Sequence, residues 1–68
     1  MSAEDCRGAD WQQLGFRDGL YGIQRMDAVY GGQCEKHGAR VDSAAYGKGW
    51  QDGKWEYEKR AMRDNSGD

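Results

Sequence analysis

The sequence predicts an all-α fold, a small helical hairpin built from a duplicated glycine-rich helix with a short helix between the two copies. Three observations predict it. Proline is absent, several of the eleven glycines recur at helical spacing, and one glycine–aromatic segment occurs twice. Regular periodicity is the main sequence signal of a helix, and an internal repeat indicates a duplicated unit. The 68 residues suffice for one domain with a small core.

The repeat relates the segment LGFRDGLYG, which contains Gly15, to the segment KGWQDGKWE, which contains Gly49, at an offset of 34 residues. Both segments carry a glycine, an aromatic residue, an aspartate, a second glycine and a second aromatic residue in the same order. Asp18 of the first copy therefore corresponds to Asp52 of the second. Two copies are too few for a solenoid, and they suit two helices packed about a pseudo-two-fold axis.

Five glycines are expected to line the contact between the two helices. On each helix they form a narrow stripe that is flanked by large apolar side chains. A glycine inside a helix costs about 1 kcal/mol relative to alanine, so five of them need a reason, which is close approach of the two backbones. The alternative is that they break the helices into loops. The expected packing residues are Gly15, Gly19, Gly22, Gly49 and Gly53.

Capping residues set the expected helix bounds. Asp10 and Gln13 resemble a capping box at the start of the first helix. Asp27 is expected to cap the middle helix, with Gly38 as the left-handed residue after its end. Asp42 or the serine that follows it caps the last helix. The expected helices cover about 11–26, about 28–37 and about 43–62, in one domain over 1–68 with polar tails at 1–9 and 64–68.

Cys6 and Cys34 are expected to form a disulfide. It would close a loop of about 28 residues and stabilise the small core by about 3–4 kcal/mol, and it would imply an oxidising compartment. The alternatives are two free thiols in a reducing compartment, or a zinc site formed by the cysteines, His37 and a carboxylate. The second cysteine or histidine pair that is typical of zinc sites is missing, so we expect no metal and no cofactor.

No group of residues is arranged for covalent chemistry, so we expect a protein that is not an enzyme. No serine or cysteine has a base beside it in a recognisable motif. Asp18 and Asp52 form a symmetric carboxylate pair that could act as acid and base. We expect a structural role for both, in which they accept hydrogen bonds from a tryptophan N–H, a tyrosine O–H or loop amides. Catalytic carboxylates with shifted pKa values need a cleft, which so small a chain can hardly build.

Net charge and hydropathy limit the classes of partner and the cellular locations that we expect. A formal net charge of −2 gives no general attraction to nucleic acid or anionic lipid, because both require a positive field. We expect no transmembrane segment, and the first ten residues lack the apolar stretch of a signal peptide. These features favour a cytoplasmic location or a mature form of an exported protein.

The order of the motifs is more specific than any one motif. It runs C-x3-D-W-x3-G-x2-D-G-x2-G from Cys6, then C-x3-G-x3-D-x3-Y-x2-G-x3-G-x3-Y from Cys34 to Tyr57. This order resembles the family called domain of unknown function 2799, which is found mostly in small bacterial cell-envelope lipoproteins. The resemblance implies a periplasmic or cell-envelope location. The segments GFRDGLYG and YGKGWQDG resemble ribosome modulation factor more weakly, which implies a ribosome or RNA binder.

The expected function is a non-enzymatic binding protein of the bacterial cell envelope that acts through protein–protein contact, with an unidentified partner protein or as a homodimer. The alternatives are a ribosome or RNA binder, although the net charge disfavours nucleic acid, and a small phage-borne inhibitor that binds a protein. Trp55 and Met62 are the expected interface, because Tyr46, Trp50 and Tyr57 make the better core. Tryptophan and tyrosine dominate interface hot spots. The opposing interpretation is that all the aromatic side chains close one monomeric core.

Overall fold

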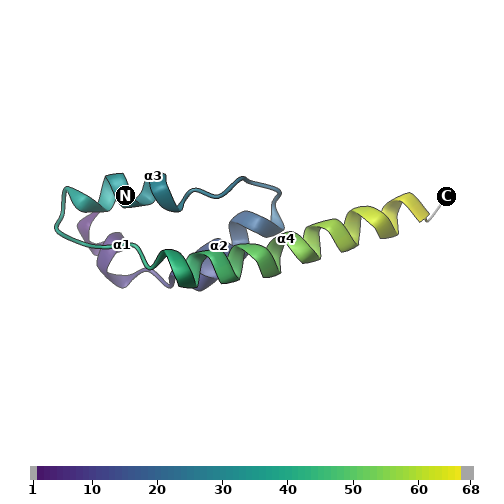
Figure 1. Cartoon of the computed structure of the whole chain (residues 1–68), viewed down its shortest axis with the longest axis horizontal. Helices are drawn as coiled ribbons and strands as arrows, with labels where there is room; N and C mark the ends of the chain where they lie inside the picture. Colours follow the sequence, from purple (N-terminus) through teal and green to yellow (C-terminus); the bar gives the residue numbers. More distant parts are fainter. Residues whose placement is uncertain (1, 67–68) are drawn as a thin grey trace.

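The computed structural model describes residues 2–66, with side chains described as far as residue 61, and within that range it contains helices and no strand. The all-α class is therefore confirmed. In Figure 1, α2 and the first half of α4 lie side by side, while the second half of α4 extends alone toward the C-terminus. The molecule is elongated, 50 × 16 × 15 Å. The helices are α1 (Ala3–Gly8), α2 (Trp11–Leu20), α3 (Asp27–Glu35) and α4 (Ser43–Ser66).

The two copies of the repeat, α2 and α4, run parallel to each other, whereas a hairpin would place them antiparallel. Gly15 lies against the backbone of Tyr46, and Gly19, one turn later, lies against the backbone of Lys54. Residue numbers therefore increase together along the two helices. The connection over residues 21–42 makes this direction possible, because it carries the chain back from the end of α2 to a point beside its start.

Direct backbone contact between α2 and α4 depends on four glycines. A Cβ atom on any of them would overlap a carbonyl oxygen of the other helix, so no larger residue fits without moving a backbone. When the two copies of the repeat are exchanged, by moving each residue 34 positions along the chain, two of the contacts become the other two. The helices α2 and α4 therefore pack about a pseudo-two-fold axis that is parallel to both helices. Each glycine and the residue whose carbonyl it faces are Gly15–Tyr46, Gly19–Trp50, Gly49–Gln12 and Gly53–Phe16.

Gly22 ends α2 and does not join the packing stripe, which corrects the expectation for this residue. Its φ angle is +72°, a left-handed conformation that favours glycine. The amides of Gly22 and Ile23 donate to the carbonyls of Gly19 and Asp18 at 3.1 and 2.9 Å. This closing pattern stops α2 at Leu20 instead of near residue 26.

The first helix, α1, lies in the segment that was expected to be a polar tail over residues 1–9. The Ser2 side chain caps it by accepting a hydrogen bond from the amide of Asp5 at 3.1 Å. A helix of six residues is not stable in isolation. It forms because Cys6, which is 2% exposed, fastens it to α3.

The bounds of α3 and α4 differ slightly from the expected ones. α3 begins at Asp27, which lies inside the first turn and pairs with Arg25 at 3.1 Å instead of capping the helix. Gly38 has a φ angle of +70°, as expected for the residue that closes this helix. Asp42 caps α4 by accepting from the amide of Ala45 at 3.0 Å. α4 continues to residue 66 instead of ending near 62, so the expected tail at 64–68 is partly helical, and residues 67–68 lie outside the description.

None of the helices described between residues 2 and 66 is both long enough and apolar enough to cross a membrane.

The glycine contact predicts that Gly19→Ala and Gly53→Ala each lower the free energy of unfolding by more than about 2 kcal/mol, because the added Cβ must push two backbones apart. Chemical denaturation followed by far-UV circular dichroism measures this. Gly32→Ala is the matched control, since Gly32 lies on α3 with open space around it. Alanine there should stabilise by about 1 kcal/mol through helix propensity. Wild-type stability in both packing variants would contradict the contact.

Candidate functional site

A buried carboxylate, Asp18, joins three helices. Its side chain is 2% exposed, and its Oδ2 atom accepts hydrogen bonds from the hydroxyls of Tyr46 at 2.6 Å and Tyr30 at 3.0 Å. The three residues come from α2, α4 and α3. A buried charge is costly unless it is paired or hydrogen-bonded, and the guanidinium of Arg17 lies 3.8 Å from Oδ1. The carboxylate therefore fixes α3 against the parallel pair, in the hydrogen-bonding role expected for it.

Asp52, the counterpart of Asp18 in the repeat, is exposed, which corrects the structural role expected for it. The reason is that α3 covers one of the two faces that the pseudo-two-fold axis relates. On that face Tyr30 and Tyr46 reach Asp18. On the opposite face Gln12 stands in the place of Tyr46, and no third helix within residues 2–66 supplies a donor to Asp52. The repeat is symmetric in sequence, but its environment is not.

Burial raises the pKa of both tyrosine hydroxyls in this cluster. For Tyr30 and Tyr46, loss of hydration is the largest cause, and the hydrogen bond to Asp18 adds to it. The Tyr46 hydroxyl also accepts a hydrogen bond from the amide of Met26 at 3.0 Å, which partly opposes the rise in pKa. Both hydroxyls are therefore protonated at neutral pH, and each can donate to the carboxylate.

The predicted disulfide between Cys6 and Cys34 is confirmed, and it links α1 to α3. Both residues are buried, and they belong to the same core cluster as Trp11 and Tyr46. The zinc alternative is wrong for these residues, because zinc binds thiolates and not sulfurs that are bonded to each other. His37 is exposed, and within the described residues no group of three histidine, cysteine or acidic residues is placed to hold a metal ion.

The return segment between α2 and α3 is fastened to α4 by polar contacts. The indole N–H of Trp50 donates to the carbonyl of Ile23 at 2.8 Å. Arg25 donates to the carbonyl of Ser43 at 3.4 Å, and its guanidinium lies 6.0 Å from the ring centre of Tyr46. These contacts hold the start of α3 in register with the start of α4.

Large apolar side chains are exposed where α4 extends past the end of α2. We call residues 55–66 the α4 overhang, because Lys54 is the last α4 residue that faces a packing glycine. Trp55 is 60% exposed, as expected for an interface residue. Tyr57 is 47% exposed instead of joining the core, because α2 ends before it. The buried part of its ring packs against the turn at Gly22. The expected interface residue Met62 lies outside the described side chains.

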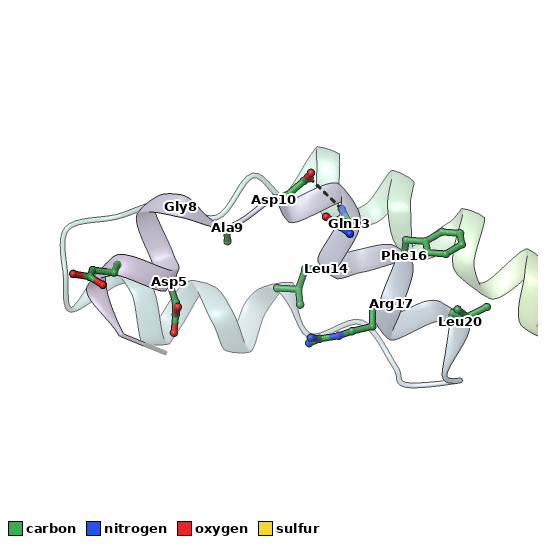
Figure 2. A pocket seen from close by; sticks show the side chains of 10 residues that line it. Asp5, Gly8, Ala9, Asp10, Gln13, Leu14, Phe16, Arg17 and Leu20 are labelled. Carbon is green, nitrogen blue, oxygen red and sulfur yellow. Dashed lines mark hydrogen bonds between the residues drawn. The ribbon is translucent and has the colours of Figure 1, made fainter.

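A shallow groove of about 670 Å³ follows α1 and α2. Figure 2 shows Phe16 and Leu20 at one end of this groove, Asp5 at the other and Leu14 between them. The lining is therefore apolar toward the end of α2 and acidic toward α1. The residues that form it are Glu4, Asp5, Gly8, Ala9, Asp10, Gln13, Leu14, Phe16, Arg17 and Leu20.

The sequence profile of one protein family, described as "Protein of unknown function (DUF2799)", matches residues 10–67. The matched region contains both copies of the repeat and the Asp18 cluster, and it begins after α1. No curated protein matches the chain, and no solved structure does. The resemblance to ribosome modulation factor is not shown by these comparisons.

The disulfide predicts that Cys6→Ala/Cys34→Ala, or full reduction, lowers the free energy of unfolding by about 3–4 kcal/mol, because a loop of 28 residues is no longer closed in the unfolded chain. Denaturation with and without reductant measures the difference. The double variant serves as the control, since reductant should change nothing in it. Equal stability of oxidised and reduced wild-type protein would contradict the prediction.

The tyrosine cluster predicts a loss of stability at alkaline pH. The unfolded chain releases the tyrosine protons near pH 10, whereas the folded state holds that of Tyr46 to higher pH. Above about pH 10 the unfolded state therefore binds fewer protons, and stability falls as the pH rises. Denaturation over a pH series measures the slope. Tyr46→Phe should be less stable at neutral pH but should show a shallower alkaline decline, and parallel profiles would contradict this account.

Proposed function

The chain belongs to the DUF2799 family, and we propose that it is a non-enzymatic protein that binds another protein in the bacterial cell envelope. One observation carries the proposal. The α4 overhang presents Trp55 and Tyr57, 60% and 47% exposed, on a helix that α2 no longer covers. Exposed aromatic side chains are typical of protein contact sites, where they contribute much of the binding energy.

The groups that carry covalent chemistry in other proteins have structural roles in this chain, which supports a binding function. The carboxylate of Asp18 is buried beneath two tyrosine hydroxyls. The sulfurs of Cys6 and Cys34 are bonded to each other. General acid–base catalysis requires a titratable group held within reach of a substrate. The groove along α1 and α2 is lined by neither Asp18 nor either cysteine, and the carboxylates that do line it, from Glu4, Asp5 and Asp10, are exposed to solvent.

The buried disulfide supports the proposed cell-envelope location. Disulfides persist in oxidising compartments such as the bacterial periplasm and are rare in the cytosol. Because Cys6 and Cys34 lie in the core and close a loop of 28 residues, this bond is expected to stabilise the folded state. An oxidising compartment of a bacterium is therefore the environment that suits the chain. Ribosome or RNA binding is less well supported, because a net charge of −2 lacks the release of counterions that drives such binding.

Trp55→Ala and Tyr57→Ala should each weaken capture of the partner protein from a bacterial envelope extract by about 10-fold or more, the loss typical of an interface hot spot. Quantitative pull-down with the tagged protein measures it. Val29→Ala is the matched control, since Val29 is 47% exposed on α3, away from the overhang. Trp55→Ala and Val29→Ala should keep the wild-type melting temperature, and far-UV circular dichroism checks the helix content of Tyr57→Ala, whose ring contacts the turn at Gly22 in the wild type. Undiminished capture by both aromatic variants, or salt-sensitive retention on ribosomes, would count against the proposal.

A further inference from the structure

We propose that the oxidation state of Cys6 and Cys34 is a switch for the whole fold: the dithiol form of the chain is mostly unfolded at about 37 °C, and formation of the disulfide folds it. This switch is separate from the proposed binding function and does not depend on it. It follows from how little apolar core the chain has and from which helices the disulfide joins.

The core is small, and the disulfide makes up much of it. Over residues 2–61, where side chains are described, the buried apolar side chains are those of Cys6, Trp11, Cys34 and Tyr46. The molecule is also elongated, and its surface of 4902 Å² exceeds the about 4300 Å² that is typical of a compact chain of 7.7 kDa. A domain of this size commonly needs a disulfide, a metal or a partner chain to be stable.

The disulfide joins the two helices that are weakest on their own. α1 has six residues, too few for a stable isolated helix. α3 contains Gly31 and Gly32, and each shifts the equilibrium about fivefold toward the unfolded chain relative to alanine. A Cβ atom on either glycine would meet no atom within 4 Å, so no close contact offsets this cost. Both helices therefore rely on the link between Cys6 and Cys34.

Loss of the disulfide also weakens the cover over Asp18. α3 carries Tyr30, whose hydroxyl donates to the Asp18 carboxylate at 3.0 Å. Without the bond, a loop of 28 residues is open in the unfolded chain. The ratio of folded to unfolded chain then falls by a few hundredfold, which corresponds to about 3–4 kcal/mol at tenfold per 1.4 kcal/mol. A loss of this size is comparable to the whole stability of a small domain with a single core.

The switch closes by thiol–disulfide exchange with a disulfide oxidant, which must act on the chain before it folds. In the unfolded chain, one cysteine thiolate attacks the disulfide of the oxidant and forms a mixed disulfide. The second cysteine thiolate then displaces the oxidant, which leaves as two thiols that carry the two hydrogens of the chain's own thiols. In the folded protein Cys6 and Cys34 are 2% and 0% exposed, so a thiol reductant reaches their bond only after the chain unfolds.

The folding of the dithiol form tests the proposal directly, and wild-type protein suffices for the test. Far-UV circular dichroism and amide chemical-shift dispersion are recorded at about 37 °C for the oxidised protein and for protein kept in a phosphine reductant. The oxidised protein should be folded, whereas fewer than half of the reduced molecules should be. Removal of the reductant and addition of glutathione disulfide should restore the spectra of the oxidised protein.

Gly31→Ala/Gly32→Ala is the matched variant, because it keeps both cysteines and adds two methyl groups in open space. Alanine favours the helix about fivefold at each position. The ratio of folded to unfolded chain in the reduced variant should therefore be about 30-fold higher than in the reduced wild type. The oxidised forms of the two proteins should have the same spectra.

The burial of the sulfurs adds a kinetic test. Reduction of the oxidised wild type by excess dithiothreitol should accelerate steeply in urea concentrations below the unfolding midpoint, because reduction follows opening of the fold. Three results would overturn the switch: a reduced wild type that is more than half folded at about 37 °C, a reduced glycine variant that is no more folded than the reduced wild type, or a rate of reduction that urea does not change.

Discussion

Direct backbone contact between α2 and α4 is the constraint on which the rest of the structure depends. The absence of Cβ atoms on Gly15, Gly19, Gly49 and Gly53 lets the carbonyls of each helix lie over the other. Each of these glycines costs about 1 kcal/mol in helix propensity, which the contact must offset. Because the two helices are parallel, the chain has to return along their whole shared length. That return segment contains α3, and α3 places Tyr30 over the buried carboxylate of Asp18.

The buried carboxylate and the exposed aromatic side chains arise where the symmetry of the repeat is broken. The glycine contacts obey the pseudo-two-fold axis, but α3 covers one face only, so Asp18 is buried and Asp52 is exposed. The two helices also differ in length. Gly22 ends the first helix, α2, at Leu20, whereas α4 continues to residue 66, so the α4 overhang extends beyond the end of α2. The exposed aromatic residues are therefore a consequence of unequal helices on an otherwise symmetric scaffold.

Local signals made much of this fold predictable. The caps at Asp10 and Asp42 follow from hydrogen bonds made within one turn, and glycine periodicity indicated the close helix contact. The direction of the pair was not predictable, because a pseudo-two-fold axis is compatible with parallel and antiparallel helices. α1 was missed because its stability comes from the disulfide and not from its own six residues. The exposure of Tyr57 depends on where α2 ends, and Gly22 fits the spacing of a helical stripe as well as a helix end.

The central claim, a parallel pair of helices in contact through their glycines, is tested most directly by nuclear Overhauser contacts in solution. The glycine Hα protons face the other helix, so their neighbours report both the closeness and the direction of the pair. The structure predicts contacts from Gly15 to the backbone around Tyr46 and Trp50, and from Gly19 to the backbone around Trp50 and Lys54. Contacts in the reverse order, with Gly15 near Lys54 and Gly19 near Tyr46, would contradict the account, as would no contact between the two helices.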